Sequence, residues 1–231
     1  FDEDFSGADA WSDTGTRVGV NTTSDRIEVT DDSNANDDGT HISLLTASSL
    51  GSIATTWVID FDVTSGSSTS QNTNANAQEV VFAISDTSTA TAIDSTDQKQ
   101  IVITHSMYGS GEHIVLNSSV NSNIRSGGTN AETTTAWYTT AGTKYYRLIN
   151  DSVNTILEIY SDSARTILYA SATQALASGV TDLDYFKVQM WTGNSAVNGQ
   201  HDISVDNVKF WNGITNPVNQ EVATFSEPFT D

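Results

Sequence analysis

The chain has no cysteine, only 2 prolines, and only 9 lysine and arginine residues among 231. Without cysteine, neither a disulfide framework nor a thiolate metal site can form. The 29 acidic residues bring the formal charge to −20. Nucleic acid is therefore not an expected partner, because a phosphate backbone requires a cationic surface. No apolar run approaches the roughly 18 residues of a membrane-spanning helix, so we expect no membrane insertion.

The composition that remains is typical of strands and turns. Hydrophobic residues make up 37% of the chain and charged residues 16%, and serine, threonine, asparagine and glycine fill much of the rest. Threonine and aromatic residues suit a pleated, half-buried surface, whereas serine, asparagine, aspartate and glycine favour turns. The composition predicts an all-β protein whose acidic surface suits a salty medium, divalent cations, or both.

Short strand-like runs recur along the chain with turn residues between them. No stretch shows a helical period over eleven or more residues, and the best helical candidate, residues 171–183, contains Gly179 and allows at most one turn. This pattern predicts a two-sheet antiparallel jelly-roll sandwich. The predicted strands are 17–20, 26–30, 41–45, 56–64, 79–85, 99–105, 113–117, 144–150, 155–160, 166–170, 185–191 and 201–211.

Two of these runs alternate clearly between apolar and polar residues. Residues 57–63 place Trp57, Ile59, Phe61 and Val63 on one face. In residues 203–211 the apolar positions change from odd to even numbers at Asp206-Asn207. The slip of one residue predicts a β-bulge or a kink directed at a ligand.

A short motif, F-x-E-x-F-[S/T], occurs at both ends of the chain. The first copy contains Phe1 and Phe5, and the second contains Phe225, Glu227 and Phe229. The repeat could be a coincidence. Otherwise it indicates either a tandem array in which a second copy of the domain begins at residue 225, or a tail that binds a neighbouring subunit at the position of that subunit's own first segment. We predict a sandwich domain over 1–214, a linker over 215–224 and a terminal strand over 225–231.

Three segments together resemble the concanavalin A-like, laminin-G-like jelly-roll superfamily of lectin and surface-protein domains. Residues 3–11 (EDFSGADAW) resemble its first strand and turn, and residues 144–148 (KYYRL) with 157–162 (LEIYSD) resemble its central hairpin. Residues 205–211 (VDNVKFW) resemble its last strand, which in that superfamily returns beside the first. The resemblance implies a jelly roll whose members include lectins, carbohydrate-binding modules, glycoside hydrolases and structural repeats.

The sequence carries no recognisable catalytic motif. Hydrolases of that superfamily use an E-x-D-x-x-E strand, and this triplet does not occur. The four histidines show no H-x-H or HExxH spacing, and neither a nucleophile elbow nor a phosphate loop is present. We therefore predict that the chain is not an enzyme.

Calcium is the predicted cofactor, at two candidate sites. The first is the acidic run 31–39, whose donors resemble the start of an EF-hand loop but lack its glycine and its final glutamate. An acidic hairpin turn explains this run equally well. At the second site, which the resemblance implies, a calcium ion would bridge acidic residues of the first and last strands. The alternative is that these acidic side chains are simply exposed to solvent at the sheet edge. The candidate ligands are Asp32, Asn34, Asn36 and Asp38 in the first site, and Glu3, Asp4 and Asp206 in the second.

Glycan binding requires exposed aromatic faces with polar groups near them. The candidates are Trp137, Tyr138, Tyr108 and Trp191, although burial in the core is the ordinary fate of a tryptophan. Trp137 and Tyr138 stand out because polar residues flank them on both sides.

Three functions follow from these observations. The first is a non-catalytic structural or adhesive module, outside the cell or at its surface, that assembles head to tail with copies of itself through the terminal strand. An unpaired sheet edge can accept such a strand. The second is a lectin-like carbohydrate-binding module of a secreted or virion protein. The third is a divergent glycoside hydrolase, which the missing carboxylate triplet disfavours.

Overall fold

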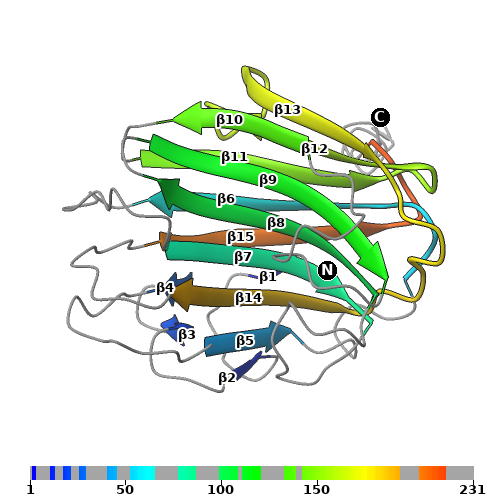
Figure 1. Ribbon diagram of the computed structural model, residues 1–231, viewed down its shortest axis with the longest axis horizontal. Coiled ribbons are helices and arrows are strands. Elements are labelled where there is room, and N and C mark those ends of the chain that lie inside the picture. Colours follow the sequence, from blue (N-terminus) through cyan, green and yellow to red (C-terminus); the bar gives the residue numbers. More distant parts are fainter. Residues whose placement is uncertain are drawn as a thin grey trace, which may run out of the picture.

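The computed structural model describes residues 2–3, 11–13, 18–21, 26–29, 41–45, 53–65, 78–86, 99–108, 111–120, 133–138, 142–192 and 203–216. This part of the chain forms two antiparallel sheets packed face to face (Figure 1). The predicted all-β, two-sheet jelly-roll sandwich is confirmed. Among the described residues no helix is long and apolar enough to cross a membrane.

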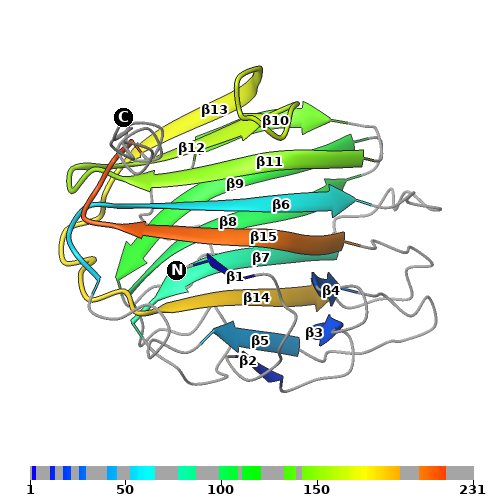
Figure 2. The same ribbon diagram turned by 180° about the vertical axis from the view of Figure 1, so that it is seen from behind.

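One sheet has eight strands, in the order β13-β12-β11-β6-β15-β4-β3, with β1 also paired to β15 (Figure 2). Strand β6 lies at its centre and pairs along its length with β11 and β15. The strands are β1 (Asp2–Glu3), β3 (Val18–Asn21), β4 (Arg26–Val29), β6 (Trp57–Ser65), β11 (Gly142–Asn150), β12 (Asn154–Tyr160), β13 (Leu168–Ala175) and β15 (Ile203–Asn212).

The other sheet has seven strands, in the order β10-β9-β8-β7-β14-β5-β2. Its long strands β7, β8, β9 and β14 lie across the first sheet (Figure 1). The strands are β2 (Trp11–Asp13), β5 (His41–Leu45), β7 (Gln78–Ser85), β8 (Lys99–Tyr108), β9 (Gly111–Val120), β10 (Thr133–Tyr138) and β14 (Tyr185–Thr192).

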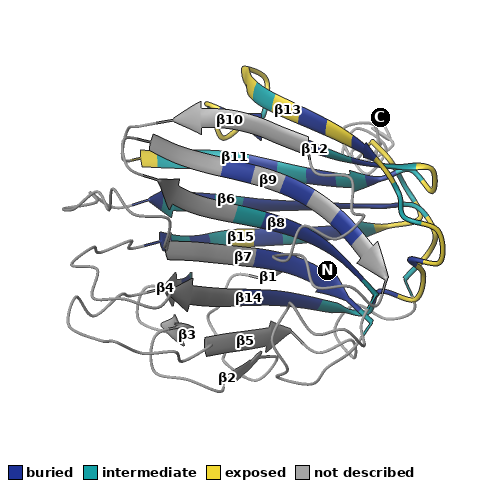
Figure 3. Cartoon of the chain, viewed as in Figure 1, coloured by how far each residue is buried: buried dark blue, intermediate teal, exposed yellow. Residues whose placement is uncertain are grey.

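The buried core residues come from strands of both sheets, and buried segments occur in both layers of the sandwich (Figure 3). The predicted apolar face of β6 is confirmed, since Trp57, Ile59, Phe61 and Val63 are all buried. Phe61 lies at the centre of an aromatic cluster, with ring centroids 5.2 to 5.7 Å from those of Tyr146, Phe82 and Phe186. Such pairs add to the stability that burial of their area already gives.

The predicted bulge in β15 is also confirmed. The register with β6 shifts between Asp206 and Lys209, and Asn207 has a φ of 52°. Val205 and Val208 are both buried on either side of the bulge. The shift therefore explains why the apolar positions change parity along this strand.

One expected strand boundary was wrong, and two strands were missed. The strand predicted at 166–170 lies at Leu168–Ala175, so the best helical candidate begins inside a strand. Asp162 causes the late start, because its carboxylate accepts hydrogen bonds from the N–H groups of Thr166 and Ile167 at 3.0 and 2.7 Å and holds them in a loop. Strands β2 and β10 were not predicted, whereas the resemblance of residues 3–11 to a first strand implied β1.

Candidate functional site

The outer face of the seven-stranded sheet carries the candidate site. Phe82, Ile84, Ile103, Phe186 and Val188 are buried in the core between the sheets. Successive residues of a strand occupy opposite faces, so the residues that alternate with these five belong to the outer face.

A single row of paired residues crosses five strands on that face. Trp137 of β10 pairs with His113 of β9, and His113 pairs with Ser106 of β8. Ser106 pairs with Glu79 of β7, which pairs with Trp191 of β14. We call these five residues the Trp–Trp row. It covers four inter-strand spacings, or about 19 Å from end to end.

The row contains two of the four residues predicted to bind glycans. A third, Tyr108, pairs with Gly111 at the β8–β9 hairpin and lies two residues beyond Ser106 on the same face. The fourth, Tyr138, pairs with Glu112 and has the parity of the core face, so the register separates it from Trp137.

The row combines the residue types that sugar recognition requires. Tryptophans at both ends are the residue type on which a sugar ring stacks, and glutamate, histidine and serine between them supply hydrogen-bonding groups. The sequence interpretation missed Glu79, Ser106 and His113 because they are far apart in the chain. Only the register of β7, β8 and β9 brings them together.

Three described residues of the outer face, away from the row, are closed to solvent. Ala83, Val102 and Lys187, neighbours across β7, β8 and β14, are 2%, 1% and 0% exposed. Lys187 lies four residues from Trp191 on β14, or about 13 Å along the strand. Burial lowers the pKa of Lys187 to about 8, although the charge of Asp86 opposes the shift.

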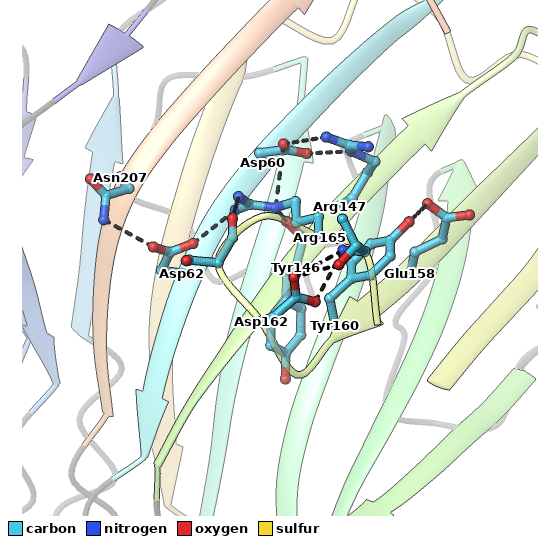
Figure 4. Close-up of polar contacts among 11 residues, drawn as sticks. Asp60, Asp62, Tyr146, Arg147, Glu158, Tyr160, Asp162, Arg165 and Asn207 are labelled. Atoms are coloured by element: carbon cyan, nitrogen blue, oxygen red, sulfur yellow. Dashed lines mark hydrogen bonds and ion pairs between the residues drawn. The ribbon is translucent and has the colours of Figure 1, made fainter. Parts of the chain in front are cut away.

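On the eight-stranded sheet, a cluster of ion pairs covers the outer face of β6 and β11 (Figure 4). Asp60 is only 3% exposed and accepts two hydrogen bonds from Arg147, at 2.8 and 2.7 Å. The Nε of Arg165 lies 3.3 Å from Asp60, and the Nη2 of Arg165 donates to Asp62 at 2.8 Å. Asn207, in the bulge of β15, also donates to Asp62, at 2.9 Å.

The cluster fastens the β12–β13 loop, residues 161–167, to the sheet. Arg165 reaches from that loop over β11 and β6, with a φ of 53°. Two arginines balance two aspartates, and every charge has a partner of opposite sign. Burial raises the pKa of Asp62, although Arg165 and Asn207 oppose it. We interpret this cluster as a structural clamp, because its charged groups form ion pairs with one another.

Next to the cluster, Tyr160 donates to the carboxylate of Glu158 at 2.5 Å. Burial, together with this bond, raises the pKa of Tyr160 to about 12. The tyrosine therefore remains protonated at any physiological pH and acts as a fixed donor.

The predicted strand pairing behind the second calcium site is present. Strand β1 pairs with β15, with Glu3 opposite Val208 and two positions from Asp206. Asp206 accepts a hydrogen bond from the N–H of Asn207 at 2.7 Å. Within the described ranges, no three acidic or histidine side chains gather as a metal site. Asp4 lies outside the described residues, as does the first site (Asp32, Asn34, Asn36 and Asp38), and calcium binding stays a prediction.

The predicted assembly residues lie outside the described residues as well. These are Phe1, Phe5, Phe225, Glu227 and Phe229. The described residues end at Asn216, and head-to-tail assembly stays a prediction.

Described side chains also enclose a pocket of about 340 Å³ at one end of the sandwich. Trp57, Val180 and Leu183 form its buried apolar floor, and Asn150 and Asp182 belong to its lining. The pocket is formed by the start of β6, the β11–β12 turn and the β13–β14 connection. It is large enough for a small ligand, and neither tryptophan of the Trp–Trp row belongs to its lining.

No family model matches this chain, and no curated protein does.

The solved structures that resemble this one share its fold at low identity. The CBM2 module of the evolved Dit protein of Lactobacillus casei BL23 phage J-1 has a TM-score of 0.54 at 11% identity, over 94% of this chain and 96% of that one. The winged bean acidic lectin, complexed with methyl-α-D-galactose, has a TM-score of 0.51 at 12% identity, over 90% and 98%. The alginate lyase A1-II′, of polysaccharide lyase family 7, has a TM-score of 0.50 at 8% identity, over 88% and 85%. The chain thus shares a jelly-roll fold with these three structures, two of which are described as a CBM2 module and a lectin and one as a lyase.

Proposed function

We propose that the chain is a non-catalytic carbohydrate-binding module of an extracellular protein and that a glycan chain lies along the Trp–Trp row. The observation that carries the proposal is the register, which puts Trp137 and Trp191 into one row with Glu79 and His113 between them. The positions of these five residues along the sequence would not by themselves place them in one row across the sheet.

The shape of the row suggests how a glycan would bind. An extended oligosaccharide running across the strands would stack one sugar on each tryptophan and use the polar centre for its hydroxyl groups. The two aromatic positions are about 19 Å apart. A short chain of several sugars would therefore bind better than a single sugar.

The structural neighbours support the same class of function. Two of them are described as a CBM2 module and as a lectin complexed with a galactoside. Because their identity to this chain is 11% and 12%, they support a binding role without indicating the sugar. An extracellular location belongs to the same proposal.

Catalysis is the competing function, since an alginate lyase has this fold. Glu79 and His113 are separated by one strand in the row, and both residue types can act as general acids or bases. A non-catalytic module predicts that bound polysaccharides keep their chain length. Shortening of the polymer, measured by size-exclusion chromatography, would assign the row to an enzyme instead.

A glycan array with the full-length protein and two variants tests the proposal. Trp137→Ala and Trp191→Ala should each lower the signal for the preferred glycan at least about fivefold, because a stacked aromatic ring contributes on the order of 1 kcal/mol or more. A pocket-filling variant, Val180→Phe, is the matched control and should bind as the wild type does. If Val180→Phe lost binding while both tryptophan variants still bound the glycan, the binding site would be the pocket at the end of the sandwich instead. A wild type that binds no glycan would refute the proposal.

A further inference from the structure

The pocket at the end of the sandwich combines its apolar floor with a buried amide. Asn150 belongs to the lining and is only 4% exposed. Its Oδ1 accepts a hydrogen bond from the N–H of Ser152 at 3.1 Å, which fixes the orientation of the amide. No described group accepts a hydrogen bond from its Nδ2. The lining therefore contains a buried donor that is still available to a ligand.

Asn150 is also part of a polar row on the core side of the eight-stranded sheet. Trp57 of β6 pairs with Asn150 of β11, Asn150 pairs with Thr155 of β12, and Thr155 pairs with Gln174 of β13. All four residues are buried, and the Oγ1 of Thr155 has no hydrogen-bond partner among the described residues. An unpartnered buried hydroxyl costs free energy. This end of the core is therefore not built for packing alone.

Two lining residues hold an unusual backbone conformation. Ser152, in the β11–β12 turn, has a φ of 75°, and Asp182, in the β13–β14 connection, has a φ of 60°. Glycine is the residue that adopts such angles without strain, because it has no Cβ. Residues held in this way are frequent where loops shape a ligand site. The backbone of both loops therefore favours a binding site over a chance gap.

Charge limits the kind of ligand that the pocket can take. Asp182 is the one charged residue of the described lining. Its side chain is 83% exposed, accepts a hydrogen bond from the Thr181 hydroxyl at 3.0 Å and lies 3.8 Å from the Nζ of Lys99. A charged ligand would lose its water on the apolar floor without gaining a buried counter-charge. The pocket therefore suits an uncharged molecule.

We propose that this pocket binds a small uncharged molecule with an apolar body and a hydrogen-bond acceptor oxygen such as a carbonyl. The body would pack on Trp57, Val180 and Leu183, and the oxygen would accept a hydrogen bond from the Nδ2 of Asn150. The volume of about 340 Å³ is that of a small-molecule site. This site is separate from the Trp–Trp row, and the proposal does not depend on glycan binding there.

A titration of the full-length protein with acetophenone, followed by NMR, tests the proposal. Acetophenone is uncharged and carries one carbonyl on an aromatic ring, so it should shift the side-chain amide signal of Asn150 until the pocket is saturated. Ethylbenzene has nearly the same shape without the carbonyl. Benzoate and benzylammonium place a negative or a positive charge on the same ring. Each charged probe should bind at least about tenfold more weakly than acetophenone, because its charge must be desolvated.

Three variants locate the site, and circular dichroism checks that each is folded. Val180→Phe fills the pocket and should abolish binding of both uncharged probes. Asn150→Leu keeps the branching of the side chain but removes the donor. It should weaken acetophenone by about fivefold and should not weaken ethylbenzene. Val153→Ala changes an exposed residue of the same turn, outside the lining, and should bind as the wild type does.

Several results would overturn the proposal. These are acetophenone that causes no saturable shift at Asn150, a charged probe that binds more tightly than acetophenone, or acetophenone binding that survives Val180→Phe. An Asn150→Leu variant that leaves acetophenone unchanged, or weakens both uncharged probes equally, would also contradict it. If Val180→Phe does not fold, the two uncharged probes on Asn150→Leu still decide. Val180→Phe that loses acetophenone but keeps its glycan would show that the two sites are independent.

Discussion

Replacing Arg147 with methionine tests the structural role of the ion-pair cluster. Arg147 makes both short hydrogen bonds to Asp60, which is 3% exposed, and its own side chain is 12% exposed. Methionine keeps much of the side chain's length but removes its charge. Asp60 would then keep only Arg165, whose Nε lies 3.3 Å away.

The expected loss of stability follows from burial. Removing one partner of a buried ion pair costs about 3 to 5 kcal/mol, because the other charge stays buried without compensation. Arg165 offsets part of this, so we expect the free energy of unfolding to fall by about 3 kcal/mol. For a chain of this size the melting temperature should fall by roughly 6 to 12 °C.

Urea denaturation followed by tryptophan fluorescence measures the change. In the double variant Asp60→Asn/Arg147→Met no buried carboxylate is left with a weakened partner, so its loss should be smaller than the sum of the two single losses. If Arg147→Met costs less than about 1 kcal/mol, the pair behaves as a solvated surface salt bridge. The account of the cluster as a clamp would then be wrong.

Three other predictions concern charge, metal and assembly. Burial lowers the pKa of Lys187 from 10.5 to about 8. Between pH 8 and pH 10.5 the unfolded chain therefore binds more protons than the folded chain. The free energy of unfolding should rise with pH over this range by up to about 3 kcal/mol. Lys187→Met should be more stable below pH 8 and lose this slope in pH-dependent urea titrations; an unchanged slope would contradict the burial argument. If calcium binds near Asp206, a chelator should lower the melting temperature of the wild type more than that of Asp206→Asn, and equal melting with and without chelator would remove the site. If the tail joins copies head to tail, Phe225→Ala/Phe229→Ala should reduce the particle size in light scattering from that of a polymer to that of a single copy, and no change would refute tail-mediated assembly.

Local patterns in the sequence were enough to predict the architecture. Alternation along residues 57–63 indicated the buried face of β6, and the change of parity at Asp206-Asn207 indicated the bulge. Both features depend on the pleat of one strand, which the sequence records directly. The resemblance of residues 3–11 and 205–211 to a first and last strand implied the β1–β15 pairing.

The remaining features depend on contacts that a single strand does not encode. Strand β13 starts later than predicted because Asp162 holds the preceding loop. The cluster on β6 and β11 needs Arg165, more than 100 positions from Asp62 in the sequence. The Trp–Trp row likewise exists only through the register of five strands. Residue types alone therefore selected Trp137 and Trp191 but missed Glu79 and His113.

The most direct test of the central claim is the affinity of the full-length protein for oligosaccharides of one type and increasing length, measured by titration calorimetry. A glycan that lies along the Trp–Trp row should bind more tightly as the chain lengthens, until it spans about 19 Å between the two tryptophans. Longer chains should then add little, and Trp137→Ala or Trp191→Ala should remove the gain from length. An affinity that is the same for one sugar as for a long chain, or that neither substitution changes, would contradict the account.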